Sequence, residues 1–374
     1  MNVREPLHCI LPPYMLKSIY TNSSGSRQRE ALASIVGSAR LRGHRQALST
    51  GARVDAALPP GGKSRRVYTA DNGSSLPGRL VMQEGDPSSA DVAVNEAYEG
   101  AGHTYDLLWQ VYERDSLDGA GMSLDATVHF QQAYVNAFWD GKQMVYGDGD
   151  GRLFNRFTVA LDVIGHELAH GVTQNTSNLN YSGQSGALNE SYSDVFGSLV
   201  KQWQRGQTAS EADWLVGQGL FTAQVKGLAL RSMKEPGTAY DDPVLGKDPQ
   251  PSHMRDYVFT LEDGGGVHIN SGIPNHAFFL TAVAMGGNAW ERAGRIWYVA
   301  GRDRMASNTK FQGAADLTFQ VAAQLYGEDS AEQNAVRYGW ESVGIMIGAQ
   351  VPVPPSPTGC SVAPLRALRS LLPR

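Results

Sequence analysis

The segment LDVIGHELAHGVTQ, residues 161–174, constrains this chain more than any other feature. It places His166 and His170 four residues apart, so that on a helix both rings project from one face and can bind one metal ion. Glu167 lies close enough to such a metal to hold a water molecule without being a ligand itself. A helix with two ordinary surface histidines would show the same pattern, so this segment alone leaves both interpretations open.

A second segment, GALNESYSD, supplies the carboxylate that a metal site of this kind requires. Glu190 lies twenty residues after His170, and two histidines with one glutamate are an established ligand set for catalytic zinc. Asp194 falls four residues later on the same helical face, and Asn189 directly precedes the glutamate. Both side chains could accept a hydrogen bond from the outer ring N–H of a ligating histidine. The two segments together favour a zinc site.

The third segment is the glycine-rich stretch DGGGVHINSG, residues 263–272. His268 in this turn, directly before an expected helix, is well placed to present its imidazole to a cleft. Asp263 could raise the basicity of that imidazole. A second glycine-rich stretch, GDGDG at residues 147–151, lacks the Lys-Ser/Thr of a phosphate loop and is expected to form a turn.

These motifs, in this order, resemble the thermolysin family of zinc endopeptidases over about residues 67–347. The leader motif PPYML resembles the protealysin branch of that family, which has short prosegments. The resemblance implies an α+β, two-domain metalloprotease with an N-terminal β-rich domain and a C-terminal mainly helical domain. It places the zinc site in the cleft between the domains and a small helical prosegment before them.

Carried over residue by residue, the resemblance implies a role for each matching position. The ligands of one catalytic Zn²⁺ would be His166, His170 and Glu190. Glu167 would be the general base, and Tyr181 and His268 would stabilise the oxyanion. The residues that would contact the substrate backbone are Asn136, Ala137 and Arg231. Those that would line the pocket for a hydrophobic residue after the scissile bond are Phe154, Phe157, Val163 and Leu230. Plain core packing explains these last four equally well.

Composition and patterning divide the chain into five segments. The expected division is 1–50 as a prosegment, 51–66 as a cleavable linker, 67–175 and 176–347 as the two catalytic domains, and 348–374 as a proline-rich basic tail. Strands and tight turns are expected up to about residue 155, and helical patterns dominate after it. An amphipathic helix is expected at residues 26–47 of the leader, with its apolar face formed by Leu32, Ile35, Val36 and Leu41.

The leader is expected to inhibit the catalytic body. Residues 1–66 carry a net charge of +8 and residues 67–350 a net charge of −16, so complementary potentials favour docking. Residues 12–16, PPYML, are expected to form a stiff, extended apolar peptide that fits a hydrophobic groove. Two routes to inhibition stay open: Pro12 and Pro13 could block the cleft, or Cys9 could reach the zinc as a thiolate.

Calcium binding is expected to be weak. Three acidic residues could still supply oxygen ligands near the position of the family's double calcium site: Asp162, Asp194 and Asp213. However, Lys201 falls where the family places a shared bridging carboxylate, and a cation beside an ammonium group is electrostatically disfavoured. We therefore expect at most one Ca²⁺ per chain.

Composition also limits the partners. The net charge of −5 makes nucleic acid an unsuitable partner for the whole molecule, and no apolar run is long enough to span a membrane. Protein or peptide substrates are expected. The leader does not resemble a standard secretory signal, so we expect export by a leaderless route, with a cytoplasmic location as the alternative.

Two other functions are compatible with the motifs. The first is a catalytically silent, peptide-binding protein on a protease fold, which is disfavoured because every residue with a chemical role is intact. The second is an exopeptidase, or a metalloenzyme with the same helix motif that does not cut peptides. The backbone-pairing motif VNAFW, residues 135–139, argues against this second alternative.

Overall fold

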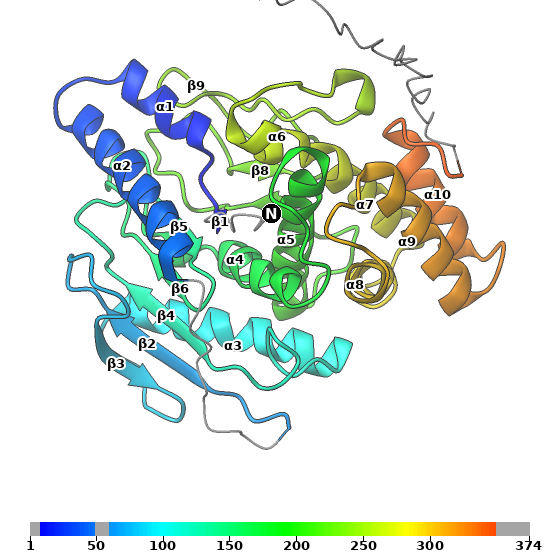
Figure 1. The fold of residues 1–374 in the computed structure, drawn as a ribbon, viewed down its shortest axis with the longest axis horizontal. Helices are drawn as coiled ribbons and strands as arrows, with labels where there is room; N and C mark the ends of the chain where they lie inside the picture. Colours follow the sequence, from blue (N-terminus) through cyan, green and yellow to red (C-terminus); the bar gives the residue numbers. More distant parts are fainter. Residues whose placement is uncertain (1–7, 49–59, 349–374) are drawn as a thin grey trace, which may run out of the picture.

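The computed structural model describes residues 8–48 and 60–348, which form two domains and a pair of N-terminal helices (Figure 1). The leader elements are β1 (His8–Cys9), α1 (Pro13–Asn22) and α2 (Gly25–Leu48). The N-terminal domain contains β2 (Arg65–Thr69), β3 (Arg79–Gln83), α3 (Val92–Tyr112), β4 (Leu124–Val128), β5 (Ala137–Trp139), β6 (Met144–Tyr146), the 3-10 helix η1 (Phe157–Val159) and α4 (Leu161–Gln174). This α+β order agrees with the sequence analysis.

The C-terminal domain is mainly helical. Its helices are α5 (Gly183–Arg205), α6 (Asp263–Asn270), α7 (Gly272–Met285), α8 (Ala293–Asp303), α9 (Phe311–Tyr326), α10 (Ala331–Ser342) and the 3-10 helix η2 (Met254–Asp256). Two short antiparallel strand pairs lie between α5 and α6: β7 (Leu215–Val216) with β8 (Arg231–Ser232), and β9 (Asp241–Asp242) with β10 (Gly246–Lys247). They bring Arg231 close to the helices that carry the zinc motifs.

A six-stranded sheet, in the order β1-β5-β6-β4-β2-β3, joins the leader to the N-terminal domain. Strand β1 pairs antiparallel with β5 at the sheet edge, with His8 opposite Trp139 and Cys9 opposite Phe138. Strand β4 runs parallel to both of its neighbours, β2 and β6, and all of its residues are buried. Two residues of the leader therefore complete the sheet of the N-terminal domain.

Helices α4 and α5 pack closely against each other at the centre of the molecule (Figure 1). Glycines make this approach possible: a Cβ on Gly197 of α5 would lie 2.3 Å from the carbonyl oxygen of Asp162 in α4. A Cβ on Gly165 would lie 3.0 Å from the Cα of Gly197. Any larger residue at position 197 would push the two helices apart and separate the side chains that face each other across them.

The leader differs from the sequence prediction in two respects. Residues 13–16 are helical rather than extended. Helix α1 begins at Pro13, and proline is tolerated there because the first residue of a helix makes no helical hydrogen bond through its backbone nitrogen. In α2, Leu32 and Val36 are exposed rather than buried, and the helix contacts the body through small residues such as Ala31 and Ser34. The helix itself, expected at 26–47, is present.

No helix among residues 8–48 and 60–348 is long and apolar enough to cross a membrane. Leu41 has no described side chain, and most of the expected linker and of the proline-rich tail, residues 51–59 and 349–374, lies outside the described residues.

Candidate metal centre and active site

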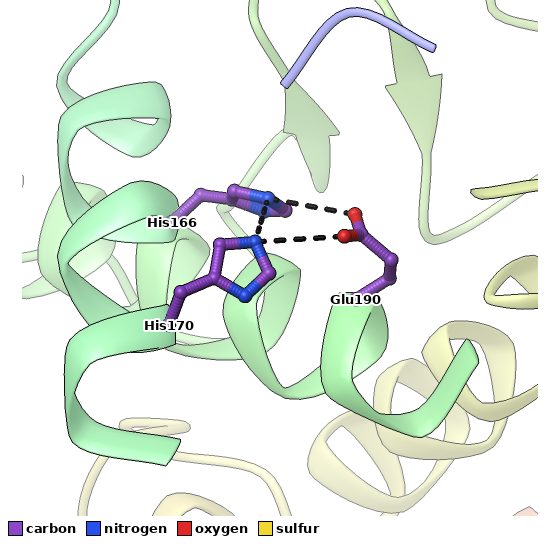
Figure 2. Close-up of side chains that lie close together, drawn as sticks. All are labelled: His166, His170 and Glu190. Atoms are coloured by element: carbon purple, nitrogen blue, oxygen red, sulfur yellow. Dashed lines mark hydrogen bonds and ion pairs between the residues drawn. The ribbon is translucent and has the colours of Figure 1, made fainter. Parts of the chain in front are cut away.

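Three buried side chains converge between α4 and α5. His166 and His170 project from one face of α4 and meet Glu190 from α5, and their ligand atoms all lie within 4.8 Å of one another (Figure 2). The two Nε2 atoms are 3.1 Å apart. The carboxylate oxygens of Glu190 lie 3.6 Å from Nε2 of His166 and 3.5 Å from Nε2 of His170.

The chemistry of these three residues fits a divalent cation. Oε2 of Glu190 is buried and has no hydrogen-bond partner among the described residues. A buried carboxylate oxygen without a hydrogen bond is costly, and two imidazole nitrogens face the same point as this oxygen. A cation bound between the three side chains would satisfy all of these atoms, and the His₂Glu set is one that zinc uses.

The outer nitrogens of the two histidines have partners that orient the rings. Nδ1 of His166 lies 2.8 Å from Oδ1 of Asp194, and Nδ1 of His170 lies 2.8 Å from Oδ1 of Asn189. Both contacts suit an Nδ1–H donor, which leaves Nε2 free to bind a metal. Burial alone would raise the pKa of Asp194, but Arg231 and His166 outweigh it and hold this pKa well below its usual value.

Glu167 lies beside the metal ligands and has one oxygen available. Its Oε2 accepts a hydrogen bond of 3.0 Å from the backbone N–H of Trp139, whereas its buried Oε1 has no partner among the described residues. Burial and the charge of Glu190 raise the pKa of Glu167 well above its usual value, against the opposing effect of backbone N–H groups. A carboxylate of raised basicity with one free oxygen suits a general base.

His268 and Tyr181 face the same point from the C-terminal domain. The Tyr181 hydroxyl donates to Oε1 of Glu190 and lies 3.2 Å from Nε2 of His268. Asp263 binds Nδ1 of His268 at 2.6 Å and accepts from its backbone N–H at 2.9 Å. Burial lowers the pKa of His268, but Asp263 and Glu190 outweigh it and raise this pKa to about 9.

The stretch that carries His268 has an unusual backbone. Asp263 and the three glycines that follow it adopt left-handed conformations, with φ of 54°, 60°, 89° and 77°. Three glycines in a row make this turn accessible, because residues with a Cβ rarely adopt positive φ. The right-handed helical conformation begins only at Val267, and the imidazole of His268 faces Glu190 of α5.

The leader occupies the space in front of these groups. The carbonyl oxygen of Cys9 accepts from Nε2 of His268 at 3.0 Å, and the N–H of Ile10 donates to the carbonyl of Ala137 at 3.2 Å. Nη1 of Arg231 donates to the carbonyl of Ile10 at 3.1 Å. Leu11 donates from its N–H to Oδ1 of Asn136 at 3.0 Å. The three residues expected to contact substrate backbone therefore all bind the backbone of the leader.

The expected pocket residues are buried. Those in the large core cluster are Phe154, Phe157, Val163 and Leu230. The rings of Phe154 and Phe157 stack with their centroids 5.9 Å apart, and Phe154 also borders a small space shared with the leader residues Leu16 and Ile19. Their burial is compatible both with a role in a substrate pocket and with plain core packing.

Cys9 and the two prolines are close to the site in sequence but differ in their contacts. Cys9 reaches the site with its carbonyl, while its side chain packs with Phe130, Tyr134, Phe138 and Val145 in a second apolar cluster. It is not part of the group of three potential metal ligands found in the described residues. Pro12 and Pro13 lead directly from the site into α1.

The three candidate calcium residues do not gather around one point. Asp162 and Asp213 both accept from Nζ of Lys201, each at 2.8 Å, and the carbonyl of Leu215 accepts at 2.6 Å. Asp194 instead binds His166 and Arg231. The ammonium of Lys201 thus lies among three oxygens, in the manner of a bound cation.

Two contacts within the site were not expected from the sequence, although Trp139 is the last residue of the VNAFW motif. Trp139 supplies only a backbone N–H to Glu167, and backbone groups carry no signal in residue identity. Asn275 of α7 donates from its side chain to Oδ2 of Asp194 at 2.8 Å, from 81 residues away. Only the tertiary fold reveals such a contact.

Comparison with known proteins agrees with this geometry. Residues 57–174 match the family described as thermolysin metallopeptidase, catalytic domain. Residues 177–345 match the family described as thermolysin metallopeptidase, alpha-helical domain. The two matches cover both domains that contribute to the metal centre.

Individual relatives extend the similarity into the leader. An extracellular metalloprotease of Pectobacterium carotovorum subsp. carotovorum is 49% identical over 348 residues, which are 92% of this chain and 98% of that protein. Protease PrtS of Photorhabdus sp. (strain Az29) is 47% identical over 350 residues, covering 90% of this chain and 92% of its own. The solved structure of the precursor of protealysin, a metalloproteinase from Serratia proteamaculans, is 48% identical with a TM-score of 0.82, and covers 90% of this chain and 99% of its own.

Proposed function

The chain belongs to the thermolysin family of metallopeptidases, and from this we propose that it is a zinc-dependent endopeptidase made as a self-inhibited precursor. One observation carries the proposal. The free oxygen of Glu167, the three convergent metal ligands and a bound peptide backbone all meet at one buried point.

The residues of the site divide the chemistry among them. His166, His170 and Glu190 would hold Zn²⁺, which when bound supplies a Lewis acid and an activated water. Glu167 takes a proton from the attacking water and passes it to the leaving nitrogen. His268 and Tyr181 donate hydrogen bonds to the carbonyl oxygen as negative charge develops on it.

Three further residues fix the substrate backbone. Ala137 accepts an N–H, Arg231 donates to the next carbonyl, and Asn136 pairs with the following amide, as each does with the leader. Holding the peptide in one register keeps its carbonyl carbon within reach of the water, and such positioning lowers the barrier substantially.

We further propose a preference for hydrophobic residues directly after the scissile bond. The leader residue whose N–H binds Ala137 is Ile10, which is fully buried. The side chains proposed to line this pocket are Phe154, Phe157, Val163 and Leu230. All are apolar and buried, so a charged substrate residue there would lose its hydration without gaining a partner.

The leader, residues 1–50, would act as the inhibitor and be released by cleavage in the linker 51–66. Its contacts cover the backbone-binding residues that a substrate needs, and α1 adds an ion pair of 2.7 Å between Lys17 and Glu262. The precursor solved for the similar protealysin supports a precursor form of this chain. Obstruction is supported by the backbone contacts of residues 9–11, and a Cys9 thiolate on the metal stays the second route.

We propose at most one Ca²⁺ per chain, because Lys201 already supplies a positive charge between Asp162 and Asp213. Secretion is supported by relatives named as extracellular metalloproteases. Export by a leaderless route is our preferred mechanism, with a cytoplasmic location as the alternative.

Hydrolysis of casein by the purified protein, before and after incubation, tests the function. We expect activity to rise as the leader is removed and to disappear with a zinc chelator. Product sizes separate the alternatives, since internal cuts give fragments and an exopeptidase releases single residues. A precursor and a processed form with equal activity would contradict self-inhibition, and a protein that binds casein without cutting it would be a silent scaffold.

A further inference from the structure

The leader crosses the site with a defined direction and register. Strand β1 runs antiparallel to β5, and four consecutive backbone groups, from the carbonyl of Cys9 to the N–H of Leu11, each meet a different residue. In chain order, the Cys9 carbonyl meets His268, the Ile10 N–H meets Ala137, the Ile10 carbonyl meets Arg231, and the Leu11 N–H meets Asn136.

This order identifies one peptide bond as special. The carbonyl that undergoes attack must lie against the donors that stabilise an oxyanion, and Cys9 presents its carbonyl to His268. The leaving nitrogen must lie near the general base. The N–H of Ile10 donates to the carbonyl of Ala137 on β5 at 3.2 Å, and the same strand holds Glu167 through the N–H of Trp139 at 3.0 Å. Both conditions are met by the bond between Cys9 and Ile10.

Both sides of this bond are held independently. On the side of Ile10, α1 is anchored through the buried residues Met15, Leu16 and Ile19. On the side of Cys9, pairing with β5 holds the strand. The two new ends formed by a cut would therefore stay in contact at high effective concentration, which favours resynthesis over release.

We propose that Cys9–Ile10 is a self-cleavage site, bound in the register of a substrate and hydrolysed slowly because its two halves stay docked. This rests on the proposed function and adds to it a second cut, distinct from the one in the linker. The elements of one water molecule are consumed. Its hydroxyl joins the carbonyl carbon of Cys9, its proton reaches the nitrogen of Ile10 through Glu167, and the C–N bond breaks.

The first test maps cuts in the whole chain. Full-length protein is incubated with Zn²⁺, denatured at intervals and analysed by mass spectrometry. We expect a fragment of residues 1–9 that accumulates over hours and is absent from Glu167→Gln. Cleavage at a neighbouring bond between residues 8 and 13, or absence of the fragment from protein that cuts casein, would overturn the proposal.

The second test removes the restraint of α1 and α2. A synthetic peptide of residues 4–16 is given to protein that has lost its leader. We expect rapid cleavage at Cys9–Ile10, at least 100-fold slower with Ile10→Asp and unchanged with Leu16→Asp as the matched control. Loss of casein hydrolysis would disprove the proposed function, whereas intact casein hydrolysis with the peptide uncut or cut elsewhere would disprove only the register.

The third test needs neither metal nor turnover. Hydrogen exchange is measured residue by residue in full-length Glu167→Gln with a chelator present. We expect the amides of Ile10 and Leu11 to be protected, because both donate within the site. Adding Asn136→Ala should expose the Leu11 amide by at least 10-fold and leave that of Ile10 protected. Equal protection of Leu11 with and without Asn136 would refute the register.

Discussion

The pair of helices α4 and α5 holds two buried clusters of charge, and the clusters obtain their cation in opposite ways. At one end, His166, His170 and Glu190 leave a carboxylate oxygen without a hydrogen bond and fit a metal from solution. At the other end, Lys201 of α5 binds Asp162 of α4 and needs nothing from outside. A cation with a purely structural role can be a side chain, whereas one that does chemistry must keep an open position for water and substrate.

Removing a metal ligand should have the largest effect. His166→Ala or Glu190→Ala should abolish both zinc binding and activity, and thermal stability should fall because the metal links α4 to α5. Zinc content by elemental analysis and the melting temperature measure these effects. Normal zinc content in either variant would show that the ligand set is wrong.

Glu167→Gln separates chemistry from metal binding at the same end. The variant should keep its zinc and lose about 10²–10⁴ in rate, because it lacks the general base. Peptide hydrolysis and zinc content are measured on one preparation. A variant with full activity would eliminate Glu167 from the mechanism.

The substitution Lys201→Met removes the ammonium group from the second charge cluster of α4 and α5. Burial lowers the pKa of Lys201, but Asp162 and Asp213 outweigh it and keep the ammonium charged. Its removal leaves the buried carboxylate of Asp162 without its ion pair, so the free energy of unfolding should fall by about 3–5 kcal/mol. Arg205→Met is the matched control, since Arg205 lies 3.7 Å from Asp213 at the surface and should contribute about 0–1 kcal/mol. An equal loss of unfolding free energy in Lys201→Met and Arg205→Met would show that Lys201 is not a buried structural cation.

Calcium offers a finer test of the same distinction. Wild-type protein should melt at nearly the same temperature with Ca²⁺ or with a calcium-selective chelator, because Lys201 supplies the charge. Lys201→Glu places a third carboxylate beside Asp162 and Asp213, and its stability should then rise with added Ca²⁺. Two or more tightly bound Ca²⁺ ions in the wild type would contradict the role of Lys201.

In a third cluster, nearer the surface, the positive charge belongs to a histidine, which loses its proton as the pH rises. His129 lies between Asp91 and Asp148, with contacts of 2.7 and 2.9 Å. Burial lowers the pKa of His129, but the two carboxylates outweigh it and raise this pKa above its usual value. The stabilisation is present below about pH 6.5 and is lost as pH rises through the raised pKa. Melting curves from pH 5 to 9 should show a small decline that His129→Gln abolishes.

The grouping of His166, His170 and Glu190 could be predicted because its signal is local. Two of these residues and Glu167 lie within five residues on one helix, and helical periodicity places the two histidines on a common face. The partners of those residues were predictable only where they sit on the same short segment, as Asn189 and Asp194 do. Asn275 and the backbone of Trp139 were missed, because their contacts depend on how distant elements pack.

The leader was harder to predict for the same reason. Its helix was expected, but the periodicity pointed to Leu32 and Val36 as buried, and both are exposed. Small side chains allow α2 to approach the body instead, as in the contact of Ser34 with the N–H of Val135 at 3.2 Å. The pairing of Leu11 with Asn136 spans 125 residues, and no pattern within either segment encodes it.

Strand β1 lies at the edge of the six-stranded sheet, which has a consequence for the solubility of the protein after the proposed removal of the leader. While the leader is attached, the backbone groups of β5 are covered on that side. After the proposed removal of the leader, β5 would be an open sheet edge, and open edges are templates for aggregation. Under this proposal the attached leader would also protect β5 from self-association, and protein without its leader, stored at high concentration, should stay soluble longest when a short peptide fills the same edge.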